Sequence, residues 1–222
     1  NLLNINTGNV SGSGGVSYQA DNMTLTGATI VTGGAINLIP YSSGQIIDLG
    51  GVDSSGTLGL TNAELATITA SVLNIGQADV SSMLLTGSIT SPAATLNLID
   101  GDGGISQSDN TSLTATNLSI NTSGSVLIGQ GTGQNNNVGQ LAGIVAGPVT
   151  RNFLFKNNPV TTSALTIGTV NGINGINTVG GNGAISVTND NGALTVNQVL
   201  NAGTGSVTLT APASAITLNS TV

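Results

Sequence analysis

The sequence predicts an all-β protein whose chain coils on itself as a parallel β-helix of about ten coils. Short runs of alternating apolar and small polar residues, such as 184–188 and 206–210, are typical of half-buried strands. Every second run recurs after 22 residues, as from Ile185 to Val207, and this period indicates a solenoid. Gly and Asn lie between the runs, where a turn often needs a positive φ.

The same pattern is present from the start of the chain. Residues 3–6 and 23–26 alternate alike and lie 20 positions apart, as do Val16 and Ile36. At the strand spacing of about 4.8 Å, about ten coils would build a rod of order 50 Å. Later coils are slightly longer, because equivalent positions recur after 23 and then 22 residues, at Leu73, Leu96 and Leu118.

Residues 50–70 break the regular alternation and predict an excursion from the coil. Thr61 is followed three positions later by Glu64, which is the spacing of a helix capping box. Neighbouring leucines near helical spacing extend the pattern, so we expect one short helix near residues 62–68. Glu64 is then either the N3 residue of the cap, the interpretation that we favour, or a lone acid in a site.

The runs 47–51, 58–65, 68–70 and 73–76 resemble a segment of very large bacterial exoproteins similar to filamentous haemagglutinin. The resemblance implies a right-handed parallel β-helix, export by two-partner secretion, and a role as an adhesin shaft at the bacterial cell surface or outside the cell. The Asn-Pro-Asn motifs of that family's secretion domain are missing from the sequence. We therefore expect 1–222 to be a single continuous β-helix segment from the body of a longer protein.

Composition excludes several classes of partner and cofactor. Charged residues make up 5% of the chain, aromatic residues 2%, and the net charge is -7. Only Arg151 and Lys156 could bind phosphate, so we expect neither nucleic acid nor an anionic membrane as a partner. Cys and His are absent, which excludes disulfides and thiolate or imidazole metal sites, and we expect no cofactor. The mean hydropathy of +0.30 argues against disorder, and no apolar stretch approaches the ~20 residues of a membrane span.

Asp100 and Asp102 are the candidate metal ligands. They alternate with glycine in the run 100–104, as carboxylates do at the start of a calcium loop. The acid that should close such a loop is missing. We therefore favour a plain solvated turn, and calcium binding remains the alternative.

A second candidate contact lies in a segment that we expect to leave the coil as a loop or hairpin, near residues 129–160. It begins with the polar run 129–140. Both cations and both phenylalanines of the chain follow it, and they could form a surface contact for a sugar or a protein. Alternatively, the segment is an inserted hairpin or a larger corner whose rings fill the core, which we favour. These four residues are Arg151, Phe153, Phe155 and Lys156.

Three functions fit these patterns. The first is a structural shaft of a secreted adhesin or extracellular fibre that spans distance and displays loops. Its partners would be further coils of the same polypeptide, identical subunits, or glycans and proteins of a host or neighbouring cell. The second is a carbohydrate-active enzyme, although the nine acidic residues are scattered along the sequence and form no obvious catalytic pair. The third is a glycan-binding module, although the usual aromatic platforms are lacking. We expect the shaft and no enzymatic activity.

Overall fold

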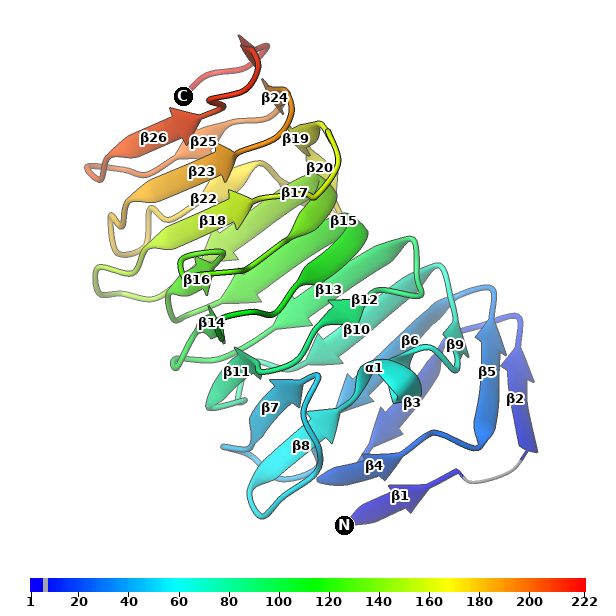
Figure 1. The fold of residues 1–222 in the computed structure, drawn as a ribbon. Coiled ribbons are helices and arrows are strands. Elements are labelled where there is room, and N and C mark those ends of the chain that lie inside the picture. Colours follow the sequence, from blue (N-terminus) through cyan, green and yellow to red (C-terminus); the bar gives the residue numbers. More distant parts are fainter. Residues whose placement is uncertain (6–7) are drawn as a thin grey trace.

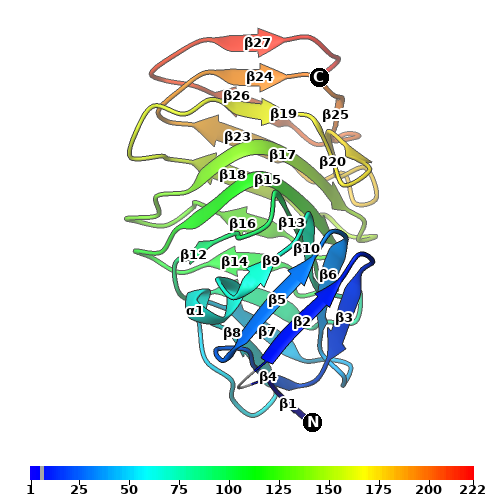
Figure 2. The ribbon, with the colours of Figure 1, turned by 90° about the vertical axis from the view of Figure 1, so that its right-hand side faces the viewer.

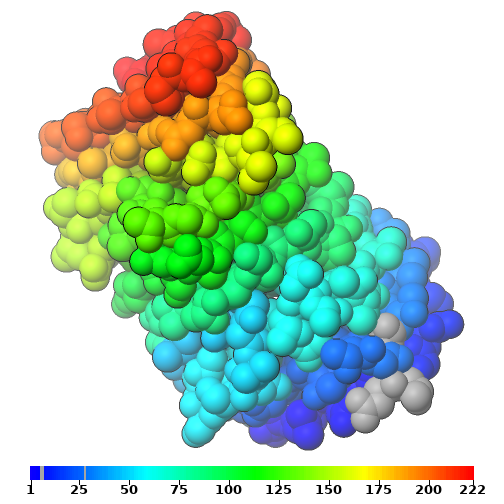
Figure 3. All heavy atoms as spheres, viewed as in Figure 1, coloured from blue at the N-terminus to red at the C-terminus, as the bar shows by residue number. Residues whose placement is uncertain are grey.

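The computed structural model describes residues 1–5 and 8–222, and it is nearly all β (Figure 1). Asn6, the last residue of the first alternating run, lies outside the described residues. The strands stack along one axis, so that the chain climbs from its N-terminus at one end to its C-terminus at the other. Figure 3 shows the same progression as successive bands of colour from blue to red.

The long sheet contains twelve strands, and nine of them form one continuous path. Every pairing in this sheet is parallel. Figure 2 shows the C-terminal strands of this path face on. The path runs through β3 (Val16–Gln19), β6 (Ala35–Ile39), β10 (Val72–Gly76), β13 (Thr95–Ile99), β15 (Leu113–Thr122), β17 (Asn137–Val145), β19 (Leu165–Ile167), β24 (Leu194–Val196) and β27 (Ile216–Leu218). Three short strands pair beside it: β12 (Ile89–Thr90), β22 (Ile176–Asn177) and β25 (Leu200–Asn201).

The second sheet lies on the other side of the core and has eight strands, again all parallel. Its order is β8 (Thr57–Leu60), β7 (Ile46–Leu49), β11 (Ser82–Leu85), β14 (Ile105–Gln107), β16 (Val126–Ile128), β18 (Phe153–Asn157), β23 (Ile185–Asn189) and β26 (Val207–Thr210). Smaller sheets complete the N-terminal part: β1 (Leu2–Asn4) with β4 (Asn22–Thr24), and β2 (Gly8–Gly12) with β5 (Ala28–Thr32) and β9 (Ile68–Thr69).

The pairing registers confirm the spacings predicted from the sequence. Leu3 pairs with Met23 and Val16 with Ile36, 20 positions apart in each case. Ile185 pairs with Val207 at 22 positions. Leu96 pairs with Leu73 before it and Leu118 after it. This long parallel stacking is solenoid-like and compatible with a parallel β-helix.

Alternate side chains of both sheets point inward and form one apolar column. The side chains of this column are almost wholly removed from water. This burial is the main favourable contribution to the folding free energy of such a structure. The two largest members are Phe153 and Phe155 of β18. The Phe153 ring fits because Gly143 lies beside it, and a Cβ added there would clash with the ring.

Within residues 1–5 and 8–222 there is one short helix, as predicted, but it spans only α1 (Asn62–Leu65). It begins at the N-cap Thr61 with a complete capping box to Glu64. The predicted extension to residue 68 is wrong, because Ile68 and Thr69 pair with β5 as β9. The segment before the helix adds an extra strand, β8, between β7 and β4 (Figure 1).

The described residues contain one antiparallel hairpin, which is formed by β20 (Thr169–Val170) and β21 (Ile173–Asn174). The hairpin lies against β17 on the outside of the long sheet. It comes later in the chain than the range 129–160 in which we expected an excursion. Within that range, β17 and β18 are ordinary members of the two long parallel sheets.

Candidate functional site

Most outward amides of the long sheet are used within the protein. Asn74 donates from Nδ2 to Oδ1 of Asn37 at 2.7 Å, and Asn97 donates in turn to Oδ1 of Asn74 at 3.0 Å. Ser119 Oγ completes the row by donating to Oδ1 of Asn97 at 2.7 Å. We call Asn37, Asn74, Asn97 and Ser119 the amide ladder. Because the strands are parallel and in register, identical outward positions lie one above another and can bond in this way.

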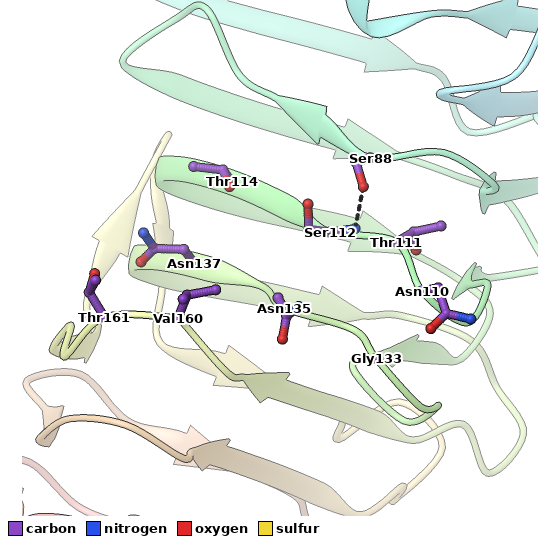
Figure 4. Close-up of a pocket in the computed structure, with 10 residues that line it drawn as sticks. All are labelled: Ser88, Asn110, Thr111, Ser112, Thr114, Gly133, Asn135, Asn137, Val160 and Thr161. Carbon is purple, nitrogen blue, oxygen red and sulfur yellow. Dashed lines mark hydrogen bonds between the residues drawn. The ribbon is translucent and has the colours of Figure 1, made fainter.

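A different arrangement occurs at the polar groove, a hollow of about 350 Å³ on the outer surface (Figure 4). Its lining consists almost entirely of hydroxyl and amide side chains, and it contains no charged and no aromatic residue. The lining residues are Ser88, Asn110, Thr111, Ser112, Thr114, Gly133, Asn135, Asn137, Val160 and Thr161.

The groove is assembled from four successive passes of the chain. Thr114 of β15 is the register partner of Asn137 of β17, so these two lie one above the other. Ser88 lies on the preceding pass, next to β12, and its Oγ accepts a hydrogen bond from the backbone N–H of Ser112 at 3.0 Å (Figure 4). Thr161 follows β18 and supplies the fourth level. The side chains therefore rise in steps along the axis of the stack.

The loop 129–136 forms one wall of the groove and is held by its own amide side chains. Gln134 is buried, and its Nε2 donates to the carbonyl oxygens of Gln107 at 2.9 Å and Ser108 at 3.0 Å. Its Oε1 accepts from the N–H of Gly131 at 2.7 Å. The polar run expected to leave the coil is thus folded back onto the preceding turn.

Six side chains of the lining make no hydrogen bond to any part of the chain that the structure describes. Each carries a donor and an acceptor, and all are partly or fully exposed to solvent. They contrast with the amide ladder, in which the same kinds of group bond to each other. The six are Asn110, Ser112, Thr114, Asn135, Asn137 and Thr161.

A second pocket, of about 290 Å³, brings together two acids that are eleven positions apart, Asp53 and Glu64. Asp53 Oδ2 accepts from the N–H of Met23 and Oδ1 from that of Gly59, each at 2.9 Å. Glu64 Oε2 accepts from Thr61 at the cap, and Oε1 accepts from the N–H of Leu25 at 3.3 Å. Every carboxylate oxygen of this pair is therefore bonded to the chain itself.

These bonds explain why two acids lie there. Met23 of β4 and Leu25 just after it present N–H groups toward β8, and side-chain carboxylates accept them where no strand pairs. Burial raises the pKa of Asp53, against the two backbone hydrogen bonds that lower it. The predicted capping role of Glu64 is confirmed. The pair's bonding is that of a structural bridge between β4 and the inserted segment.

The two candidate metal ligands do not share an environment. Asp100 is 2% exposed, whereas Asp102 is exposed. Asp100 Oδ2 accepts from Thr122 Oγ1 at 2.9 Å and from the N–H of Gly104 at 2.7 Å. The expectation of a plain solvated turn is wrong at Asp100, because the turn at 122–124 packs against it. Burial raises the pKa of Asp100 to about 6, an effect that these hydrogen bonds only partly offset.

The four residues of the expected surface contact are divided between the two faces of one segment. Phe153 and Phe155 are buried in the apolar column, as the favoured interpretation predicted, but they lie on the regular strand β18 and not in an inserted hairpin or a corner. Arg151 is half-buried, and Lys156 forms an ion pair with Asp190 at 2.7 Å. The rings therefore cannot stack on a surface ligand alongside the two cations.

Among the described residues, no group of three or more acidic side chains converges as a metal site would require. The helix that the structure describes is too short to cross a membrane. In comparisons with protein-family models, curated proteins and solved structures, nothing matches the chain.

The polar groove was not anticipated from the sequence. Its residues belong to runs such as 110–114 and 133–137, which are no more polar than many other turns of this chain. The available signal was the register: Ser112 and Thr114 recur as Asn135 and Asn137 after 23 positions. That spacing stacks polar side chains, but it does not reveal whether they bond to each other.

Proposed function

We propose that the chain is a shaft segment of a secreted bacterial surface adhesin or extracellular fibre, built as a right-handed parallel β-helix of about ten coils. The observation that carries the proposal is the continuous parallel path of nine strands over an unbroken apolar column. Such a stack keeps its ends a fixed distance apart, and about 4.8 Å is gained with each added strand. The resemblance to filamentous haemagglutinin points in the same direction.

The chemistry of the chain suits export and a passive mechanical role. A chain without cysteine cannot form incorrect disulfides while unfolded. Its stability resides in burial and ladder pairing between neighbouring coils, so it should add up along the axis. We propose further coils of the same polypeptide or identical subunits as its structural partners, and two-partner secretion as its export route.

Catalysis is the weaker alternative. A glycoside hydrolase needs one carboxylic acid free to donate a proton and one carboxylate free to attack the sugar or to activate water. Asp53 and Glu64 are the acids that share a pocket, and their oxygens accept hydrogen bonds from the chain itself. This arrangement favours a structural role.

Immunogold electron microscopy of intact cells of the source organism tests the proposal. Antibodies raised against 1–222 should label the outside of the cell or shed fibres, with gold particles standing off from the outer surface. Label that appears only after the cells are opened would contradict the proposal. Purified protein should also leave a panel of polysaccharides uncleaved, and catalytic release of sugars would favour the enzyme instead.

A further inference from the structure

We propose that the polar groove is a binding site for a neutral saccharide chain lying along the axis of the stack. This proposal goes beyond the shaft and does not depend on it, because the groove would exist on a rod of any length. Three features of the groove carry the argument: the free hydrogen-bonding groups, the missing charge, and the stepped arrangement of the lining.

The free groups match the chemistry of sugar hydroxyls. Asn135 and Asn137 each offer two N–H donors and one carbonyl acceptor, and Thr114 offers a hydroxyl. A sugar hydroxyl also donates and accepts, so it can bond to either kind of group. In the described part of the chain, these three side chains have no protein partner. A ligand would therefore not have to break an internal hydrogen bond to reach them.

The absence of charge in the lining selects against ions. Phosphate and sulfate are bound through Arg, Lys or clustered backbone N–H groups, and none of the ten lining residues is basic. Asp109 lies next to Asn110, and its Oδ1 accepts from the N–H of Thr132 at 2.8 Å. With a net charge of -7 on the chain, an acidic polymer would be repelled.

The lining rises in steps rather than closing around a point. Thr114 and Asn137 are register partners on adjacent strands, and their backbones therefore lie about 4.8 Å apart. Ser88 extends the series on one side and Thr161 on the other. A ligand that uses several steps must be extended and must repeat its hydroxyl groups, as a saccharide chain does. Val160 is 82% exposed and provides an apolar patch for the face of a sugar ring.

Calorimetric titration of the whole chain with defined hexasaccharides tests this assignment. The probes are cellohexaose, maltohexaose, mannohexaose and the hexamer of N-acetylglucosamine, with hexamers of galacturonic acid and of hyaluronan as acidic counterparts. At least one neutral probe should bind with a millimolar or lower Kd, and the acidic probes should bind at least about tenfold more weakly. Binding by none of the neutral probes, or equal binding by an acidic one, would overturn the proposal.

Variants show whether binding occurs in the groove. The double substitution Asn135→Ala with Asn137→Ala should raise the Kd of the bound probe at least about tenfold, since two hydrogen-bonding side chains are lost. Thr114→Val removes one hydroxyl with little change of shape and should raise Kd about fivefold. The matched control is Asn197→Ala, which removes an amide bonded to Asn219 instead, and it should leave Kd unchanged. Unchanged binding by both groove variants would refute the site.

Discussion

The amide ladder and the polar groove contain the same kinds of side chain but use them differently. In the ladder, Asn97 accepts from Ser119 above it and donates to Asn74 below it. In the groove, Thr114 and Asn137 are also register partners, yet neither bonds to the other. A parallel stack thus brings like positions together, and the side chains at each step decide whether the row becomes internal structure or stays available to a ligand.

The ladder also shows how the row is ended. Beyond Ser119, the next outward position is Ala142, and both are fully buried beneath the hairpin β20–β21. Gln140 anchors the hairpin by donating from Nε2 to the carbonyl oxygen of Thr169 at 2.8 Å. The row of bonded side chains therefore ends where small side chains, Ser119 and then Ala142, replace the amides.

The comparison depends on the assignment of inward and outward positions, and the largest expected effect tests that assignment. Val187 is fully buried, whereas its neighbour Ser186 points outward and is only partly buried. Val187→Asp should cost at least about 4 kcal/mol of unfolding free energy, because an unpaired charge enters the apolar column. Ser186→Asp should cost no more than about 1 kcal/mol. Urea unfolding measures both, and equal losses would invalidate the assignment.

Asp100 differs from both the ladder and the groove, because it is a buried polar side chain that belongs to no ladder and has almost no access to solvent. Its folded pKa of about 6 lies above the unfolded value of 3.8, so the folded state holds the proton more tightly. The free energy of unfolding should therefore fall as the pH rises from about 4 to about 6, by about 3 kcal/mol in all. Asp102 is the charged neighbour that adds to this rise in pKa.

Asp100→Asn isolates this effect, because the amide oxygen can still accept from Thr122 and Gly104. The variant should lack that part of the pH dependence and should be more stable than the parent at neutral pH. Unfolding curves of both proteins at a series of pH values provide the comparison. Parallel pH profiles for the two would show that Asp100 does not hold its proton in the folded state.

The ladder should contribute measurable stability. Asn97→Ala removes two hydrogen bonds and leaves the hydroxyl of Ser119, which is fully buried, without its acceptor. We expect a loss of about 2 kcal/mol of unfolding free energy, most of it from the unsatisfied hydroxyl. Thermal unfolding followed by circular dichroism measures the change. A loss below about 0.5 kcal/mol would mean that the ladder contributes no significant stability.

The groove should contribute almost nothing to stability. Asn137→Ala removes an amide that has no hydrogen-bond partner in the described part of the chain, so the unfolding free energy should change by less than about 0.5 kcal/mol. The same thermal unfolding experiment applies. A loss as large as that of Asn97→Ala would contradict the view that the groove amide is free.

The repeat, the strands and the capped helix could be predicted because they depend on local pattern. Alternation assigns Val187 inward and Ser186 outward, and the spacing of Leu73, Leu96 and Leu118 sets the register. The burial of Asp100 was missed because it depends on a turn twenty-two positions later, at Thr122. The groove was missed for a related reason. Whether its side chains bond to each other or stay free depends on where the loop 129–136 folds back, and the sequence pattern does not show this.

Cysteine cross-linking tests the in-register parallel stack most directly, because the native chain contains no cysteine. Ser186 and Thr208 are register partners on β23 and β26, so cysteines at both positions should have Cα atoms about 5 Å apart and form a disulfide readily. Ser186 with Thr210, one step further along the same face, should be too distant to bridge. Rapid oxidation of the first pair alone is the predicted result. Equal oxidation of both pairs, or oxidation of the second alone, would contradict the register on which the whole fold depends.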